Sequence, residues 1–260
     1  CNSMHMPPDM ARALAAVNAK ADAFEQVMAL SSEVYRAAPA RRTLRFELLG
    51  KSYFAKLHSG VGWREIFKNL LLLRLPILSA IAEVYAIRKL NELGIPTTPL
   101  VAYGCRGISP AGLHSFVITE DLGDIISLET LCADWKNNPP DARLKRRLIV
   151  AVAKIARTLH GNGLNHRDFY ICHFCLDKQR LISGEIYLYL IDLHRVGIRE
   201  KIRPDARMKD MAALYFSAMD AGLSKRDYLR FLRTYRQYPL HEVLSSESNF
   251  WEKVEKRASG

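Results

Sequence analysis

The chain has few cysteines, and the way they are placed excludes a disulfide-stabilised secreted domain. Five cysteines, at positions 1, 105, 132, 172 and 175, follow no regular spacing. An odd number of cysteines without regular spacing fits a reducing compartment such as the cytosol better than an oxidising one. Cys172 and Cys175 would form at most half of a zinc site, because no second Cys/His pair accompanies them. We therefore expect buried thiols at these two positions.

The sequence also lacks an apolar run that could cross a membrane. Leu70–Ile87 approaches the necessary length, but Arg74, Pro76 and Glu83 interrupt it, and a span needs about 20 predominantly apolar residues. The opening Cys1–His5 has no apolar signal core. We interpret residues 1–19 as an N-terminal extension or cloning remnant that lies outside the fold.

Acidic residues are outnumbered, which favours an anionic partner. The chain has 38 Lys and Arg against 27 Asp and Glu, a net charge of +11. Nucleic acid, anionic lipid and acidic protein all satisfy that charge. The 260 residues, 49% of them hydrophobic, suffice for one large domain or two small lobes around a cleft.

The order of the predicted elements indicates an α+β chain with strands first and helices second. In the first part we expect a helix at Ala21–Leu30, strands at Glu33–Arg36, Thr43–Leu48 and Ser52–Leu57 with a turn at Gly50-Lys51, an amphipathic segment at 61–80, a helix at Ile81–Leu93, and strands at Leu100–Tyr103 and His114–Thr119. After the polar connector Glu120–Asp124 we expect helices at Leu128–Asp134, Asp141–His160, Lys209–Asp220 and Lys225–Tyr235, with short strands at Phe174–Leu176 and Ile186–Leu190. This predicts an N-lobe at 20–120 and a helical C-lobe at 121–260.

Two aspartates follow apolar segments near the start of the predicted C-lobe. Asp168 ends the triplet His166-Arg167-Asp168, and Asp192 follows the apolar strand that ends at Ile191. Phosphoryl transfer needs one carboxylate to orient the attacking hydroxyl and another to hold Mg²⁺ against nucleotide phosphates. A surface aspartate and a turn cap are the ordinary explanations of such residues. The apolar flanks of both favour catalysis at Asp168, with His166 and Arg167 in the same catalytic loop, and metal binding at Asp192.

A lysine on an apolar strand supplies the complementary charge. Lys56 lies in Tyr53-Phe54-Ala55-Lys56-Leu57. Alone it would be a solvated side chain, but with two aspartates downstream it becomes the expected partner of the ATP phosphates. Glu83, on the following helix, is the preferred residue to hold Lys56, and Glu65 is the alternative.

These residues resemble a known family. The matching segments are Arg41–Glu47, Tyr53–Lys56, Asn165–Asp168, Tyr170–Phe174, Ile191–Arg195, Lys209-Asp210 and Leu214–Ser217. The chain resembles the bacterial lipopolysaccharide core heptose(I) kinase family, within a wider set of lipopolysaccharide kinases with a protein-kinase-like fold. The resemblance implies a bilobal fold and transfer of the γ-phosphoryl group of ATP, with Mg²⁺, to a heptose hydroxyl of the inner core.

The sequence departs from the general protein-kinase pattern at several points. No Gly-x-Gly-x-x-Gly precedes the strand lysine; the loop 37–42 takes its place, and its Arg41 and Arg42 would contact phosphates by charge. The resemblance implies further ATP contacts at Glu120 and Leu122, and it implies that Asp210 braces the backbone of the catalytic loop. His173 stands where a metal-binding asparagine is expected, and imidazole is a poor Mg²⁺ ligand, so its metal role is doubtful. An Ala-Pro-Glu segment is missing, which disfavours a protein acceptor.

A run of basic residues follows Asp192 and predicts an anionic acceptor. Its members are Arg195, Arg199, Lys201, Arg203, Arg207 and Lys209. A solvated basic face is the ordinary explanation of a charge run. Inner-core sugars carry carboxylates and lipid A carries phosphates, and arginine engages both groups bidentately. We assign acceptor binding to Arg195, Arg199 and Arg203.

The segment Trp63–Leu78 has three explanations: core packing, contact with a membrane surface, or binding of an acidic protein such as an acyl carrier protein.

Two other functions remain open. One is a kinase for another core sugar, Kdo or a second heptose, and the other is a non-catalytic pseudokinase that binds anionic lipid. No nucleic-acid motif occurs, so we expect no nucleic acid partner. The expected location is the cytoplasm, at the cytoplasmic face of the inner membrane.

Overall fold

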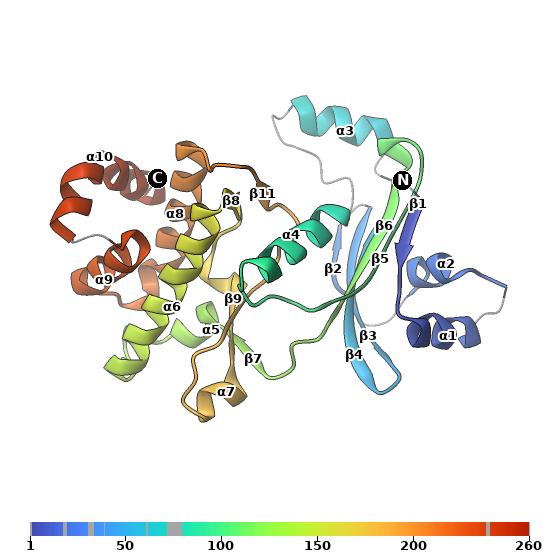
Figure 1. Ribbon diagram of the computed structural model, residues 1–260, viewed down its shortest axis with the longest axis horizontal. Helices are drawn as coiled ribbons and strands as arrows, with labels where there is room; N and C mark the ends of the chain where they lie inside the picture. Colours follow the sequence, from blue (N-terminus) through green and yellow to red (C-terminus); the bar gives the residue numbers. More distant parts are fainter. Residues whose placement is uncertain are drawn as a thin grey trace. The chain divides into compact units, whose positions relative to one another are not determined.

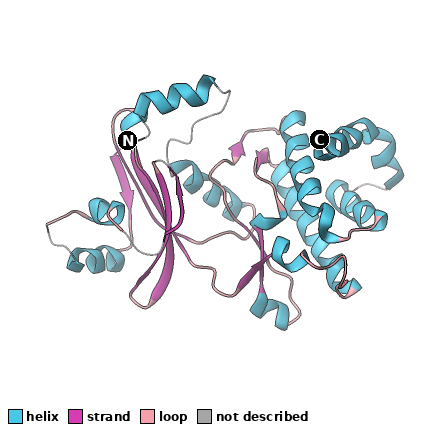
Figure 2. Ribbon diagram, turned by 180° about the vertical axis from the view of Figure 1, so that it is seen from behind, coloured by secondary structure: helices cyan, strands magenta, loops and turns pink. Residues whose placement is uncertain are grey.

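The computed structural model describes residues 2–17, 20–30, 34–38, 40–60, 62–71, 80–237 and 240–259. The chain forms two compact units, which we name by their content. The sheet unit comprises Cys1–Lys89 and Thr98–Leu122, and the helical unit comprises Leu90–Thr97 and Gly123–Gly260. Strands dominate the first unit and helices the second (Figure 2), as the predicted α+β class requires.

The sheet unit is built on one antiparallel sheet. Its strands lie in the order β1 (Asn2–His5), β5 (Leu100–Arg106), β6 (His114–Glu120), β4 (Lys51–His58), β3 (Arg41–Leu48) and β2 (Val34–Ala38). The β3–β4 hairpin turns at Leu49 and Gly50, both with positive φ (52° and 74°). Two central residues of positive φ are the mark of a tight hairpin turn. The predicted turn was one residue too late, since Lys51 already pairs with Leu48.

Alternation along the strands separates two faces of this sheet. On one face, Phe116 and Ile118 pack with residues of α1 (Pro8–Val17) and α2 (Ala23–Met28). Val117, between them, packs on the other face against Val84 of α4 (Ile81–Glu92) and against Ala80, which directly precedes that helix. Figure 1 shows α1 and α2 on one side of the sheet and α4 on the other. Successive side chains of a strand point to opposite faces, so the residue that pairs with Val117 faces α4. That residue is Lys56.

The N-terminal residues correct one expectation. Residues 1–19 were expected outside the fold, but Asn2–His5 pair with β5, and Met10 and Leu14 are buried in the core of the sheet unit. The periodic apolar positions of α1 give the physical reason, because they cover a sheet face that would otherwise be exposed. Cys105 is disulfide-bonded, which the scattered cysteine spacing did not predict. Cys132, Cys172 and Cys175 form no disulfide; Cys175 is buried as expected, whereas Cys172 is half-buried.

The remaining elements of the sheet unit are α3 (Gly62–Leu71) and the 3-10 helix η1 (Pro110–Gly112). The rest of the predicted amphipathic segment, residues 72–79 with Arg74 and Pro76, lies outside the described residues, as does Glu33. None of the helices that the structure describes combines the length and the apolar character needed to cross a bilayer.

The helical unit has one long central helix, α6 (Ala142–Gly161), capped by the Asp141 carboxylate, which accepts from the Leu144 N–H at 2.9 Å. The other elements are β7 (Ile125–Ser127), α5 (Leu128–Cys132), β8 (Leu164–Asn165), η2 (Ile171–His173), β9 (Phe174–Asp177), α7 (Lys178–Ile182), β10 (Leu188–Leu190), β11 (Gly197–Ile198), α8 (Pro204–Ala218), η3 (Met219–Ala221), α9 (Lys225–Arg236) and α10 (Leu240–Ser259). α7 and α10 were not predicted. α8 begins five residues earlier than expected, because Pro204 is well suited to a first helical turn.

Two short strands of the helical unit position its functional loops. β8 pairs antiparallel with β11 in the register Asn165↔Gly197. A Cβ atom at Gly197 would lie 2.4 Å from the Asn165 side-chain oxygen, and one at Gly163 would lie 1.8 Å from the Arg199 carbonyl oxygen. Glycine at position 163 therefore permits a close approach of two backbones, and glycine at position 197 leaves room for the Asn165 side chain.

Candidate active site

The predicted lysine–glutamate pair is present in the sheet unit. Lys56 Nζ lies 2.6 Å from Glu83 Oε1, and the side chains are 27% and 4% exposed. The pair forms because Lys56 faces α4 and Glu83 lies in the first turn of that helix. A glutamate at this distance fixes a flexible four-carbon side chain in one orientation. The alternative partner, Glu65, has a side chain outside the described part of the chain.

The other residues assigned to ATP lie at the ends of strands. Residues 37–42 were expected to form a loop, but most belong to the β2–β3 hairpin, with Ala40 at φ 63°. The Arg42 guanidinium donates to the Met28 carbonyl at 3.1 Å, while Arg41 pairs with His58 in the sheet register. Glu120 ends β6, and Leu122 is the last residue of the sheet unit.

The catalytic loop of the helical unit is held by a buried carboxylate. Asp210, on α8, is 1% exposed. It accepts from the backbone N–H groups of His166 at 2.7 Å and Arg167 at 2.9 Å. Arg167 has φ 72°, a left-handed conformation that is costly for a side-chain-bearing residue. The brace that the resemblance implied is therefore present, and it offsets backbone strain beside Asp168.

Two residues that the sequence did not single out extend this brace. His160, near the end of α6, places Nε2 3.0 Å from Asp210 Oδ2 and Nδ1 2.8 Å from the Tyr235 hydroxyl. An ionised Asp210 accepts from Nε2, and in the tautomer with its proton on that nitrogen Nδ1 accepts from the Tyr235 hydroxyl. Burial raises the pKa of Tyr235 to about 12, so it remains a donor. The position of His160 next to the apolar Leu159 was a weak signal, and Tyr235 gave none.

His166 was predicted to be catalytic, and its contacts are those of a residue that positions the loop. Its side chain is buried, and its Nε2 lies 2.9 Å from the Ile191 carbonyl. Burial lowers the pKa of His166 below its ordinary value, so the ring is neutral and donates through Nε2. This bond joins the catalytic loop to the residue before Asp192. Arg167 likewise contributes through its braced backbone.

Asp168 presents its carboxylate at the surface of the helical unit. The side chain is 17% exposed, and Oδ1 accepts from the Arg195 guanidinium at 2.7 Å. The backbone carbonyl of Asp168 lies 2.6 Å from His173 Nδ1. The loop is thus fixed from several sides while the carboxylate stays accessible, as a hydroxyl-orienting residue requires.

Asp192 also has a left-handed backbone, with φ 62°. Its Oδ1 lies 2.5 Å from His194 Nδ1, and its Oδ2 lies 3.2 Å from His173 Nε2. Burial opposes protonation of His173, but its bonds to Asp192 and to the Asp168 carbonyl outweigh burial and raise its pKa. His173 therefore contacts the carboxylate proposed for metal binding.

The side chains around Asp192 fit a magnesium site in which the protein supplies one carboxylate. Among the described residues no group of three or more His, Cys, Asp or Glu side chains could hold a metal ion. Mg²⁺ is usually bound by one or two carboxylates together with phosphates and waters, rather than by an all-protein cage. Asp192 alone satisfies that pattern. The hydrogen bonds of His173 fit a support for Asp192 better than a second ligand.

The basic residues that were predicted to bind the acceptor make several different contacts. Arg195 bonds Asp168, Arg203 pairs with Asp205 at 3.1 Å, and Arg199 donates its backbone N–H to the Gly163 carbonyl at 3.1 Å. Arg207 pairs with Glu247 of α10 at 3.2 Å, so it ties α8 to α10.

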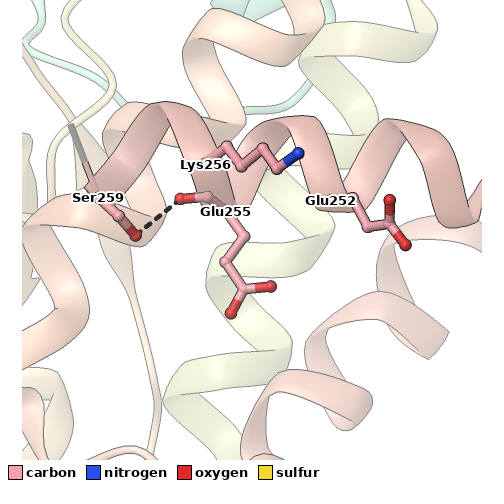
Figure 3. Close-up of a pocket in the computed structure, with 4 residues that line it drawn as sticks. All are labelled: Glu252, Glu255, Lys256 and Ser259. Atoms are coloured by element: carbon pink, nitrogen blue, oxygen red, sulfur yellow. Dashed lines mark hydrogen bonds between the residues drawn. The ribbon is translucent and has the colours of Figure 1, made fainter.

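A surface pocket elsewhere on the helical unit contains none of the predicted site residues. Glu252, Glu255, Lys256 and Ser259 line it, all from α10 (Figure 3). Ser259 Oγ donates to the Glu255 carbonyl within the same helix at 2.9 Å. A pocket on one face of a single helix offers no convergent groups for chemistry.

The catalytic geometry accompanies extensive similarity to known proteins. The chain is 50% identical, over 91% of its length and 89% of the relative's, to a protein of Pseudomonas aeruginosa named lipopolysaccharide core heptose(I) kinase WaaP. It is 49% identical to the protein of that name from Escherichia coli K12, over 88% and 86% of the two chains. A solved structure described as WaaP in complex with acyl carrier protein superposes with a TM-score of 0.83 at 41% identity, covering 99% of this chain and 98% of that one. The pattern of the lipopolysaccharide kinase (Kdo/WaaP) family matches residues 25–235. The chain belongs to this family of lipopolysaccharide kinases.

Proposed function

We propose that the protein is an ATP-dependent kinase that phosphorylates a hydroxyl of heptose I in the lipopolysaccharide inner core. The observation that supports this best is the joint presence of the Lys56–Glu83 pair, the braced Asp168 and Asp192 in a chain half identical to proteins named heptose(I) kinase. A pseudokinase would not need all of these groups, and no observation on the described residues favours that alternative.

Each group has a distinct task in phosphoryl transfer. Lys56, held by Glu83 at 2.6 Å, neutralises charge on the ATP phosphates. Asp168 accepts a hydrogen bond from the acceptor hydroxyl and aligns its oxygen for attack. The transition state involves little covalent participation by the protein, so alignment and charge account for most of the rate. The hydrogen bonds of Asp210 stabilise the backbone that carries Asp168.

Magnesium and ATP follow from the kinase class. Asp192 would hold Mg²⁺, which neutralises charge on the transferred phosphoryl group when bound. Arg41, Arg42, Glu120 and Leu122 remain proposed ATP contacts, and Arg195, Arg199 and Arg203 remain proposed acceptor contacts.

The direct test is transfer of ³²P from γ-labelled ATP, with Mg²⁺, to lipopolysaccharide that lacks core phosphate. Wild type is compared with Asp168→Asn, Asp192→Asn and the control Asp134→Asn, an exposed aspartate that bonds only neighbouring asparagines among the described contacts. We expect label in the heptose with wild type and the control, and a loss of at least about 100-fold in the two site variants.

Three outcomes would redirect the proposal. Label in Kdo or in a second heptose would keep the kinase and change the acceptor. ATP binding without transfer to any core acceptor would bring the pseudokinase back, and equal activity of Asp168→Asn and Asp134→Asn would remove Asp168 from the mechanism.

We infer that an acyl carrier protein is a partner of this chain. Two observations support it: the solved relative is described as a complex with that protein, and the net charge of +11 favours an acidic partner. Acylated carrier protein should raise the melting temperature of the purified kinase, and added salt should weaken the effect. No shift with acylated or free carrier protein would contradict the inference.

We also infer that the protein contacts the cytoplasmic face of the inner membrane through α3. Ile66 of this helix is buried, while Trp63, Phe67 and Leu71 are 53%, 60% and 84% exposed. Their spacing of four residues puts them on one stripe, beside the cations Arg64 and Lys68. An apolar stripe flanked by cations suits an anionic lipid surface.

The membrane contact is tested by sedimentation with vesicles. Wild type should bind vesicles rich in anionic lipid and bind zwitterionic ones weakly. Trp63→Ser with Phe67→Ser should lower binding about 10-fold or more, whereas Ile182→Ser, which changes an 80% exposed apolar residue of α7, should not. Equal binding by both variants would exclude α3 as the contact.

A further inference from the structure

The short β8–β11 pair brings a basic residue onto the catalytic carboxylate. The register Asn165↔Gly197 holds the segment that carries Arg195 beside the segment that leads to Asp168. A turn closed by the bond from the Val196 N–H to the Leu193 carbonyl, at 3.1 Å, presents Arg195. Leu193 is 1% exposed and anchors that turn. The backbone thus builds this contact, so it is more than a chance meeting of two surface side chains.

The contact leaves most of the guanidinium available. Arg195 Nη1 donates to Asp168 Oδ1 at 2.7 Å, and the Arg195 side chain is 46% exposed. A guanidinium has five N–H donors in a planar fork, suited to binding two anions at once. Arg203, by contrast, is paired with Asp205 on its own helix. Of the three proposed acceptor residues, Arg195 is the one whose described contacts include the carboxylate of Asp168.

We propose that Arg195 determines acceptor specificity by bridging Asp168 and an anionic group that the acceptor carries near the hydroxyl to be phosphorylated. This rests on the proposed kinase function. The anionic group is a carboxylate of an acidic core sugar or a phosphate of the lipid anchor, and the guanidinium binds both by the same chemistry. An acceptor with the anion in place aligns its hydroxyl with Asp168, whereas a neutral sugar does not.

The experiment combines changes in the protein with changes in the acceptor. Wild type, Arg195→Gln, Arg195→Lys and the control Arg180→Gln are assayed; Arg180 is a 43% exposed arginine of α7 that pairs with Glu185. Each is given three acceptors: the intact core lipopolysaccharide, one whose sugar carboxylates are reduced to alcohols, and one whose lipid phosphates are removed.

We expect Arg195→Gln to raise the acceptor KM about 10- to 100-fold on the intact acceptor, the range of a charge-assisted hydrogen bond, with the ATP KM unchanged. On the acceptor that lacks the bridged anion, the acceptor KM of wild type should rise by the same factor, and that of Arg195→Gln should rise little further. The two changes remove the same single interaction. The acceptor that shows this behaviour identifies the anion as carboxylate or phosphate. Arg195→Lys should recover part of the loss, and Arg180→Gln should match wild type.

Two results would overturn the bridge. Arg195→Gln could lower kcat by one factor on all three acceptors with the acceptor KM unchanged, which would make Arg195 a structural support of Asp168. Alternatively, wild type could show the same KM on all three acceptors, a result that does not depend on the variant folding. Failure of the kinase function itself would be distinct, because wild type would then transfer no label to the intact acceptor.

Discussion

The two units place their charged groups by different means. In the sheet unit, Lys56 and Glu83 lie on regular elements, and strand alternation with one helix turn brings them together. In the helical unit, the loops beside Asp168 and at Asp192 have left-handed residues at Arg167 and Asp192. Long-range hydrogen bonds hold those loops, above all from the buried Asp210. The first arrangement depends on local pattern and the second on tertiary contacts, so the two should respond differently to mutation.

Replacing Asp210 with alanine should have the largest effect. It removes the acceptor for the buried His166 N–H and His160 side chain and for the partly buried Arg167 N–H. We expect a loss of about 3 to 5 kcal/mol in the free energy of unfolding, measured by urea denaturation, and loss of transfer activity. Asp210→Asn retains one acceptor oxygen, so its free energy of unfolding should lie between those of wild type and Asp210→Ala. A loss below about 1 kcal/mol in the alanine variant would show that the brace is not essential.

Gly163→Ala tests the backbone approach that aligns the catalytic loop. Its Cβ would meet the Arg199 carbonyl oxygen at 1.8 Å, and its φ is 80°. We expect about 2 to 4 kcal/mol of destabilisation from strain and displaced backbone. Gly184→Ala is the matched control, with φ 84° and nothing within 4 Å of the new Cβ, and should cost only about 1 kcal/mol. Equal melting temperatures for the two variants would contradict the close approach.

Asp227→Asn should have a smaller and pH-dependent effect. Asp227 forms the capping box of α9 with Ser224 and pairs with Lys145 at 2.9 Å. Burial opposes ionisation of Asp227, but the bonds to Ser224 and Lys145 outweigh it and lower its pKa from 3.8. Because the folded-state pKa is depressed, this stabilisation is complete above the unfolded value and is lost as the pH falls through the folded value.

We therefore expect Asp227→Asn to cost about 1 to 2 kcal/mol at pH 7. The difference from wild type should shrink as the pH falls below the unfolded pKa of about 4. Urea denaturation between pH 3 and pH 7 measures it. A difference that stays constant over this range would mean that the charge of Asp227 contributes nothing.

Glu83→Gln should have the smallest effect on stability. Lys56 is 27% exposed and can recover hydration when its partner loses charge, so we expect about 1 kcal/mol or less. Activity should still fall, because Lys56 is no longer fixed. A stability loss equal to that of Asp210→Ala would remove the distinction between the two units.

The same distinction explains what the sequence predicted. The strands around Lys56, the helix of Glu83 and the long helix before Asp168 were found within a few residues, because alternation and apolar periodicity are local signals. Family, kinase class and α+β fold are confirmed. His160 and Tyr235 were missed because their roles depend on helices far apart in sequence. Residues 1–19 were wrongly set aside, since only the assembled sheet shows which face needs α1.

The segment Leu90–Thr97 has a consequence for how the chain can be divided. It belongs to the helical unit, although it lies in sequence between two elements of the sheet unit. The Pro96 carbonyl accepts from the Leu190 N–H at 2.9 Å, and the Thr97 hydroxyl donates to the Leu190 carbonyl at 2.7 Å. A fragment beginning at Gly123 would lack both partners next to the loop of Asp192. The polypeptide thus passes between the units three times, and neither unit corresponds to one continuous stretch that could be excised, exchanged or expressed alone.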